Sequence, residues 1–290
     1  MRSLLFVPGD STRKLEKSLQ SGADVLLIDL EDSVSADRKQ EARKIAAGFI
    51  AEARRPDGPR LFVRVNDLSG DMTEDDLAAV MPAGPDGIML PKSNGGSDVA
   101  LLAVKLRVHE AMAGTEDGAT SILPIITETA AGVFAASTYT AATPRLAGIT
   151  WGAEDLSAAI GAHATRTDDG VYTDVFRMAR AITILAASNA GVAAVDTVFP
   201  NFRDMDLFRK DCLEGERDGF TARMAIHPAQ VPVINEVFTP SAEAVEHARS
   251  VVSAFEDAGN PGVVAIGGAM YDRPHLARAQ RLLARASEPG

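Results

Sequence analysis

The chain has 290 residues, of which 46% are hydrophobic and 24% charged, and its formal net charge is −11. This is a globular composition, long enough for one large barrel or two ordinary domains. The acidic balance argues against a general nucleic-acid binder, which needs a basic face to neutralise phosphates. An anionic ligand stays compatible with it, because salt screens distant charges over about 8 Å.

The amino-terminal run MRSLLFVPGDS is apolar only briefly before Pro8. It supports neither a signal peptide nor a membrane span, so we expect a cytoplasmic protein without membrane contact. The single cysteine, Cys212, lies in a polar helical stretch with no second thiol or obvious base beside it. An intrachain disulfide is therefore excluded, and a catalytic thiol is not expected.

Short apolar runs alternate with longer amphipathic segments along most of the chain, as in successive βα units. Eight runs read as strands: residues 4–7, 25–30, 61–65, 87–90, 121–126, 146–150, 193–198 and 222–226. Helices are predicted over residues 12–20, 37–53, 98–113 and 173–189, several of them opened by Asp, Ser or Thr. Eight alternations fit a closed parallel barrel, and a doubly wound open sheet is the competing fold.

The ends of the predicted strands favour the barrel. They read VPGDSTRK, IDLEDS, VRVND, LPKS, ITETAAG, WGAEDL, VDTVFPN and IHPAQV. Every strand thus delivers polar residues to one rim, whereas an open sheet would concentrate them at one crevice. We predict a TIM (β/α)8 barrel over residues 1–238. Residues 239–290 form a separate segment, with helices over 241–258 and from Arg273 onward, that serves as a lid, an oligomer contact or packing on the barrel bottom.

Glu128 and Asp155 follow two successive strands, so both carboxylates should point into the same mouth. Two uncompensated anions at one mouth favour the binding of a cation between them. A pair of carboxylates suits Mg²⁺, with Mn²⁺ as the alternative, and Zn²⁺ is disfavoured because the five histidines are scattered. The competing interpretation is that each acid faces a helix N-terminus, where negative charge is favourable. Glu154 is expected to be a solvated or capping residue.

Arg64 interrupts an otherwise apolar strand and needs an anionic partner, because an isolated buried charge is costly. That partner is Asp29 or Glu31 in a structural pair, or a substrate carboxylate or enolate oxygen in a catalytic one. We assign Glu31 and Asp32 to an outer layer that orients metal-bound water or Arg64. Lys92 is either a salt-bridge partner of these acids or an anion contact.

Two further groups have weaker signals. His227, before Pro228, is interpreted as a hydrogen-bonded residue of a tight turn. The loop PGDSTRK after the first strand could receive a phosphate or carboxylate on its backbone amides, with Arg13 and Lys14 beside it.

Taken in order, eight segments resemble the HpcH/HpaI aldolase and citrate lyase superfamily, specifically stand-alone relatives of the citrate lyase beta subunit and malyl-CoA lyase. The segments are LLFVPGDSTRK, DVLLIDLEDSV, LFVRVND, IMLPKS, ITETAAGV, WGAEDL, AIHPAQV and GAMYDRPHLARA. They run nearly from end to end, which is more specific than any single motif.

The resemblance implies that Glu128 and Asp155 bind the metal, that Arg64 contacts the substrate carbonyl or carboxylate, and that Asp272 lies on a lid donated by a neighbouring subunit. It implies a homotrimer or hexamer. The implied reaction is reversible cleavage of a carboxylated 3-hydroxyacyl-CoA into acetyl-CoA and a 2-oxo acid, with Mg²⁺ holding the oxo-acid fragment and Asp272 moving the proton. Arg13 and Lys14 become candidates for the CoA phosphates, with Lys92 as a further anion contact.

One departure bears on the substrate. Hydroxy-diacid aldolases of this superfamily use a histidine after the second strand, and IDLEDSV has none. This favours the CoA-thioester branch. Two other functions stay open: hydrolysis of malyl-CoA at the same site, and a non-catalytic role as a subunit of a citrate lyase assembly.

Overall fold

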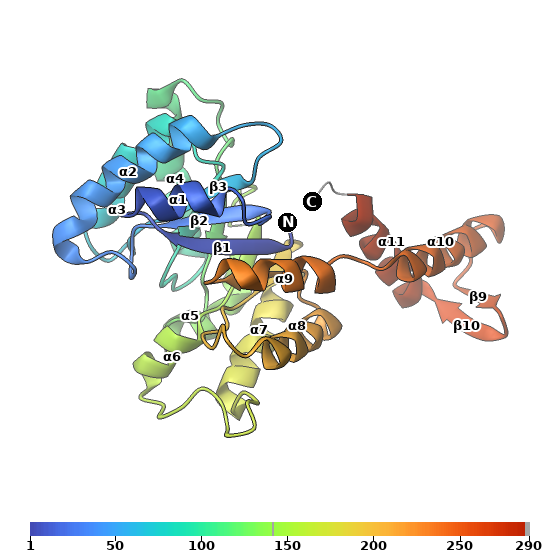
Figure 1. Cartoon of the computed structure of the whole chain (residues 1–290). Helices are drawn as coiled ribbons and strands as arrows, with labels where there is room; N and C mark the ends of the chain where they lie inside the picture. The colour runs from blue at the N-terminus through green and yellow to red at the C-terminus, as the bar shows by residue number, and fades with distance from the viewer. Residues whose placement is uncertain (141, 288–290) are drawn as a thin grey trace.

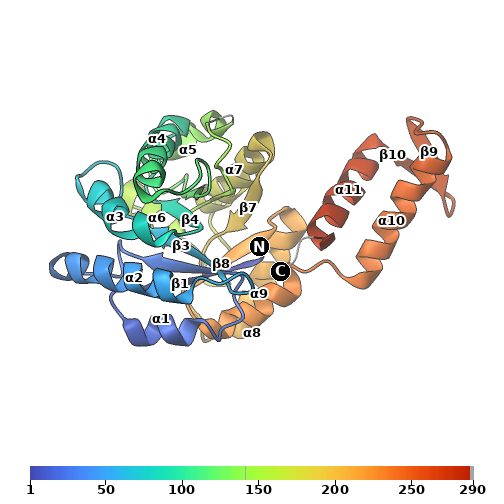
Figure 2. The ribbon, with the colours of Figure 1, turned by 90° about the horizontal axis from the view of Figure 1, so that it is seen from above.

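The computed structural model of the chain describes residues 1–140 and 142–287. Eight parallel strands alternate with helices, and the helices surround the strands (Figures 1 and 2). The strands are β1 (Ser3–Pro8), β2 (Val25–Asp29), β3 (Arg60–Arg64), β4 (Gly87–Leu90), β5 (Ser121–Pro124), β6 (Gly148–Thr150), β7 (Ala193–Asp196) and β8 (Ala222–Ala225). Each begins within two residues of its predicted start.

The sheet closes on itself between β5 and β6. Continuous ladders join the strands in the order β5-β4-β3-β2-β1-β8-β7-β6. The two end strands are joined by isolated parallel bridges, Ile122 with Leu146 and Ile125 with Thr150, and by a 2.9 Å hydrogen bond from the Ile126 N–H to the Thr150 carbonyl. The predicted barrel is confirmed, and the open sheet is excluded.

The barrel helices bury one face each, as their apolar spacing predicts. In α2 (Lys39–Ala53) the buried residues Ala42, Ala46, Phe49 and Ile50 recur at helical spacing and form one stripe against the strands. The other helices are α1 (Thr12–Ser18), α3 (Met72–Val80), α4 (Gly96–Ala113), α5 (Ala130–Phe134), α6 (Ala153–Ile160), α7 (Asp174–Ala190), α8 (Met205–Asp218) and α9 (Val231–Val237). Short 3₁₀ turns are η1 (Ala36–Arg38), η2 (Met81–Ala83), η3 (Ala136–Tyr139) and η4 (Pro228–Gln230).

Strand alternation sorts side chains into two layers. Leu4, Leu27, Phe62 and Met224 belong to the cluster that fills the barrel interior, and a larger cluster lies between the strands and the helices. Each such side chain, fully buried, contributes roughly 1.5–3 kcal/mol relative to an exposed one. The parallel register continues this pattern to the mouth, where Asp29 at the end of β2 pairs with Arg64 at the end of β3.

The last part of the chain forms an extension that stands away from the barrel (Figures 1 and 2). It comprises α10 (Ala242–Asp257), the antiparallel hairpin β9 (Val263–Ile266) and β10 (Ala269–Asp272), and α11 (Arg273–Ser287). Its own small core includes Val251, Phe255 and Leu276. Gly267 and Gly268 both have positive φ, 55° and 83°, which a tight two-residue hairpin turn requires.

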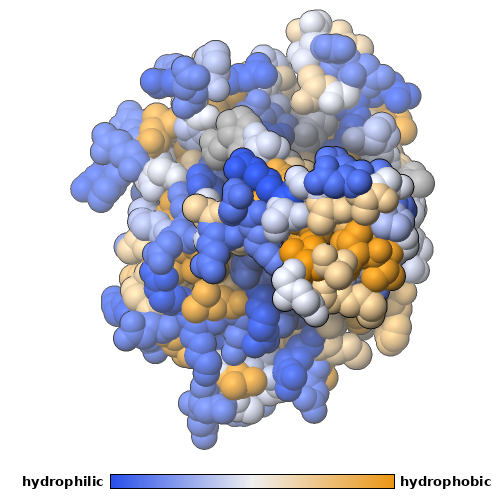
Figure 3. Space-filling model, turned by 90° about the vertical axis from the view of Figure 1, so that its right-hand side faces the viewer, coloured by the Kyte–Doolittle hydropathy of each residue, from blue (hydrophilic) through white to orange (hydrophobic). Residues whose placement is uncertain are grey.

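The extension leaves the barrel at the amino-terminal ends of the strands, opposite the mouth. Arg2, just before β1, donates a 2.9 Å hydrogen bond to Thr239 Oγ1 at the start of the connection, and Arg285 lies 4.0 Å from Glu216 near the end of α8. Figure 3 looks onto the extension and shows apolar side chains gathered there, where Val263 and Met270 are 49% and 73% exposed. None of the described helices is both long and apolar enough to span a membrane.

Candidate active site

The carboxyl ends of β2 to β6 bring the predicted site residues to one rim. Arg64 ends β3, Lys92 follows β4 and Glu128 follows β5. Glu31 follows β2, and Asp155 lies in the first turn of α6, after β6. The parallel barrel places all of these at its mouth, as predicted for this fold.

The guanidinium of Arg64 is buried and holds two carboxylates. Its Nε and Nη2 donate to Asp29 Oδ1 and Oδ2 at 2.7 and 2.8 Å, and its Nη1 lies 2.9 Å from Glu31 Oε2. Burial would raise the pKa of Asp29, but Arg64 holds it below its usual value. The sequence analysis proposed Asp29 or Glu31 as the structural partner of Arg64, and in the structure both carboxylates pair with it. Asp32 is more exposed and lies 3.6 Å from Arg64 Nη1.

Lys92 joins the acids of the mouth through two different groups. It is one of two described non-glycine residues with positive φ, 49°, and this backbone geometry turns its N–H toward Glu128 Oε2. Its ammonium bonds Glu31 Oε1 and lies 3.7 Å from Asp155 Oδ1. Burial alone would lower the pKa of Lys92, but Glu31 and its neighbours raise it, so the ammonium stays charged. Of the two interpretations of Lys92, the salt bridge is the one observed.

Glu128 is a buried acid of the site whose ionised form is disfavoured by its surroundings. Its side chain is 3% exposed, and burial, with added repulsion from Asp155 and Glu31, raises its pKa to about 8. Gly152 makes room for it, because a Cβ at Gly152 would lie 2.8 Å from Glu128 Cγ. A buried carboxylate of this kind is stabilised by a nearby cation.

The donor set fits a hard divalent cation. Glu128 and Asp155 present carboxylate oxygens, and the ammonium of Lys92 already brings a positive charge near Asp155. The two acids are therefore partly compensated, unlike the uncompensated pair that the sequence suggested. Within residues 1–140 and 142–287, no group of three or more His, Cys, Asp and Glu side chains is placed to hold a metal ion. A cation here would take two protein carboxylates and complete its shell with water or ligand oxygens.

The raised pKa of Glu128 predicts how stability depends on pH. The folded protein keeps a proton on Glu128 up to about pH 8, whereas the unfolded chain releases it near the ordinary glutamate pKa of 4.5. Between these values the folded state binds more protons, so this residue's contribution to stability falls as pH rises, by at most about 1.4 kcal/mol per pH unit. Without divalent cations, the free energy of unfolding of wild type should decline from pH 6 to 8.5 relative to Glu128→Gln. The measurement is urea unfolding of both proteins at each pH, and free energies of unfolding that change in parallel with pH would contradict the prediction. Added Mg²⁺ should raise the free energy of unfolding of wild type most at pH 8.5.

The remaining predicted residues lie outside this network of ion pairs. Arg13 and Lys14 are exposed in the first turn of α1, at the mouth end of the barrel. Asp272 pairs with His275 in the extension, so within one chain it does not meet the other site residues. His227 accepts from the Ala229 N–H at 3.1 Å, which confirms the turn interpretation.

Cys212 is buried in α8, and burial raises the pKa of its thiol to about 11. At neutral pH it is therefore a thiol and a poor nucleophile. This agrees with the expectation from the sequence.

Residues 2–228 match the family described as HpcH/HpaI aldolase/citrate lyase. The chain belongs to this family. One similar protein is the citrate lyase subunit beta of Escherichia coli strain K12. It is 33% identical to this chain over 291 residues, and the alignment covers 100% of this chain and 94% of the relative. A (3S)-malyl-CoA thioesterase of Cereibacter sphaeroides strain ATCC 17025 is 32% identical, with 98% and 94% covered.

A solved structure extends the family match to three dimensions. The protein CitE from Mycobacterium tuberculosis, in complex with magnesium, acetoacetate and coenzyme A, superimposes with a TM-score of 0.78 at 32% identity and covers 99% of this chain and 98% of its own. Membership of the HpcH/HpaI family makes this chain an enzyme of the lyase class and confirms the family resemblance drawn from its motifs.

Proposed function

We propose that the chain is a Mg²⁺-dependent carbon–carbon lyase that reversibly cleaves a carboxylated 3-hydroxyacyl-CoA into acetyl-CoA and a 2-oxo acid. Citramalyl-, malyl- and citryl-CoA are the candidate substrates. The observation that supports this most directly is the convergence of Glu128 and Asp155 with the buried guanidinium of Arg64 at one mouth. The magnesium, acetoacetate and coenzyme A bound by the Mycobacterium tuberculosis relative support the ion and the substrate class.

Each residue has a role in the proposed reaction. Glu128 and Asp155 hold the ion, with Mn²⁺ as an alternative, and the ion supplies a Lewis acid for the oxygens of the hydroxy-carboxylate fragment. Arg64 uses two of its five N–H groups on Asp29, which leaves donors for the oxygen that gains negative charge. Glu31, Asp32 and Lys92 keep Arg64 and the acids in place.

The proposed cleavage conserves atoms and electrons. The hydroxyl passes its proton to the Asp272 carboxylate of a neighbouring subunit, its carbon becomes the carbonyl of the 2-oxo acid, and the electrons of the broken carbon–carbon bond form the thioester enolate. The enolate then takes a proton at carbon and leaves as acetyl-CoA. We assign that proton to Asp272 of a neighbouring subunit in a homotrimer or hexamer, because the extension leaves its own barrel at the pole opposite the mouth. Arg13 and Lys14 are assigned to the CoA phosphates.

The function is tested by incubating the purified chain with Mg²⁺ and malyl-, citramalyl- or citryl-CoA. The expected products are acetyl-CoA and glyoxylate, pyruvate or oxaloacetate, and chelation should abolish their formation. Acetyl-CoA from none of the three substrates would contradict the proposal.

A second candidate is hydrolysis of the thioester, favoured by the likeness to a (3S)-malyl-CoA thioesterase. Product analysis separates the two, because a thioesterase releases free CoA and a lyase leaves the thioester intact. A role as an assembly subunit, suggested by the citrate lyase beta relatives, predicts no activity for the isolated chain and recovery of acyl-carrier and transferase subunits with it from native extract.

Gly152 offers a test of the cation site that leaves both acids in place. Its φ of −122° suits any residue, so Gly152→Ala acts only through the added methyl, which presses on Glu128. We expect the Kd for Mg²⁺ in calorimetry to rise about tenfold, the low end for groups that support metal ligands. Gly48→Ala is the control, because an added Cβ there would meet no atom within 4 Å beyond the adjacent residues and its own helix backbone, and it should bind Mg²⁺ as wild type does. Equal affinity of all three proteins would be evidence against Glu128 as a ligand.

A further inference from the structure

A second group of charges is buried between the barrel wall and the helices α7 and α8, outside the candidate active site. Asp196 at the end of β7 and Asp211 on α8 lie among Arg180 of α7, Arg223 of β8 and Arg166. The side chains of Asp196 and Arg223 are completely buried. Three cations and two anions with little access to solvent persist only when the geometry is closely matched, because each unpaired charge would be costly.

Both oxygens of the Asp196 carboxylate accept hydrogen bonds from more than one donor. Its Oδ2 accepts from Arg180 Nη2 at 2.6 Å and from Arg223 Nη1 at 3.3 Å. Its Oδ1 accepts from Trp151 Nε1 at 2.8 Å and from the Thr197 N–H at 2.9 Å. An ionised carboxylate offers about four acceptor positions, and all are taken here. Asp196 is therefore held by the arginines on one oxygen and holds Trp151 with the other.

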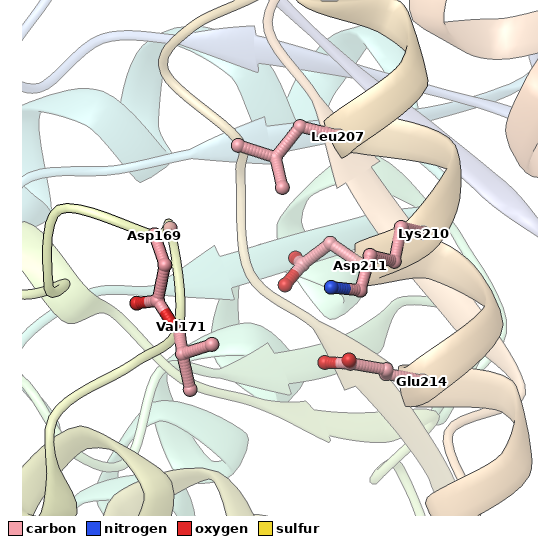
Figure 4. Close-up of a pocket in the computed structure, with 7 residues that line it drawn as sticks. Asp169, Val171, Leu207, Lys210, Asp211 and Glu214 are labelled. Carbon is pink, nitrogen blue, oxygen red and sulfur yellow. The ribbon is translucent and has the colours of Figure 1, made fainter.

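Asp211 is the outer member of the cluster. Burial would raise its pKa, but Arg223 and Arg166 lower it to about 2, so it is ionised at neutral pH. A small cavity of about 10 Å³ borders Asp211, between α8 and the loop with Asp169 and Val171 (Figure 4). This volume holds one water at most. Asp211 shares the arginines with Asp196, but the indole N–H of Trp151 donates to Asp196 and not to Asp211, which makes Asp211 a matched control.

Trp151 connects this cluster to the active site. It is the only tryptophan of the chain, fully buried, with its ring edge-on to Tyr172 at a centroid distance of 5.2 Å. The next residue, Gly152, packs against the side chain of Glu128, and its N–H lies 3.3 Å from Thr127 Oγ1. Three residues further, Asp155 lies in the first turn of α6. The indole thus anchors the segment whose backbone borders one carboxylate and carries the other.

We propose that Asp196 is a positioning residue for the cation site. By holding the indole N–H of Trp151, it fixes residues 151–155 and so sets the spacing between Asp155 and Glu128. The arginines keep the Asp196 carboxylate in the one orientation that serves Trp151. This inference rests on the proposed function, because it assumes that Glu128 and Asp155 bind a divalent cation.

The test measures Mg²⁺ affinity by calorimetry in wild type, Trp151→Phe, Asp196→Asn and Asp211→Asn. Trp151→Phe removes the indole N–H donor together with the five-membered ring and keeps a six-membered aromatic ring at this position. Trp151→Phe and Asp196→Asn should each raise the Kd about tenfold, and together by no more than the larger single effect, because they break one interaction. Asp211→Asn should lower Tm, since it removes a charge beside the same arginines, and should leave the Kd unchanged, because Arg180 and Arg223 still donate to Asp196. Titration of wild type with Mg²⁺ should also change the emission of Trp151, and Asp196→Asn should lose that change.

Several outcomes would overturn the positioning role. A wild-type Kd for Mg²⁺ in Trp151→Phe would overturn it, even if Asp196→Asn failed to fold. A rise in Kd in Asp211→Asn as large as that in Asp196→Asn would also overturn it. Absence of Mg²⁺ uptake by wild type would instead overturn the proposed function. The two failures are therefore distinguishable.

Discussion

Replacing Glu128 by Gln is expected to reduce acetyl-CoA formation at least ~1000-fold and to abolish measurable Mg²⁺ binding. Gln keeps the shape of the side chain and can still accept from the Lys92 N–H, but it cannot ionise beside a cation, so the change removes the carboxylate ligand and little else. The buried site loses one of its two anionic ligands and, with it, most of its attraction for a cation. Initial rates with saturating substrate and calorimetric Mg²⁺ titration measure both effects.

Glu154→Gln is the matched control for this variant. Glu154 precedes Asp155 in the same turn of α6 but is exposed. The control should keep wild-type rates and Mg²⁺ affinity. If Glu128→Gln retained substantial activity, or Glu154→Gln lost as much, Glu128 would not be a metal ligand.

The second large effect is expected for Arg64→Lys, with kcat lower by about 10²–10³-fold, the cost of removing an oriented donor from a developing negative charge. Lysine keeps the positive charge but cannot donate to both oxygens of Asp29 while reaching Glu31, as the planar guanidinium does. The ammonium should be drawn to Asp29, leaving the substrate oxygen without its donor. Steady-state kinetics should show a loss in kcat larger than any rise in KM.

Arg60→Lys controls for a change of arginine on β3. Arg60 lies at the other end of the same strand, exposed and away from the mouth. It should keep the wild-type kcat. A kcat for Arg64→Lys near that of wild type would show that the oriented guanidinium is not needed for the reaction.

Much of the fold could be predicted from the sequence because parallel barrel strands have a local signature. Each is a short apolar run followed by polar residues, and the run sets the strand while the polar residues mark its carboxyl end. The same reasoning found Arg64 and its anionic partners, since an arginine inside an apolar strand must be paired. Strand alternation puts Asp29 and Glu31 on the same side, and both contact Arg64 there.

The parts that the sequence did not predict depend on contacts between distant segments. The N–H of Lys92 points toward Glu128 because Lys92 has a positive φ. A lysine at that position gives no indication of this backbone conformation. The cluster around Asp196 was also missed, although Arg223 and Asp196 interrupt apolar strands as Arg64 does. That signal was present, but the partners Arg180 and Asp211 lie on helices far along the chain.

The roles of the extension could not be chosen from sequence pattern either. The sequence analysis predicted its two helices but not the hairpin between them, and the position of the extension depends on the connection after α9. The structure places it at the pole opposite the mouth, so packing across its own active site is not its role within one chain.

The most direct test of the central claim is a crystal structure of the chain grown with Mn²⁺ and measured at wavelengths that reveal anomalous scattering from the metal. A single strong peak should lie between the carboxylates of Glu128 and Asp155, about 2.0–2.3 Å from an oxygen of each, with the Lys92 ammonium still on Glu31. Glu128 and Asp155 facing apart, or a peak at another site with none between them, would contradict the account.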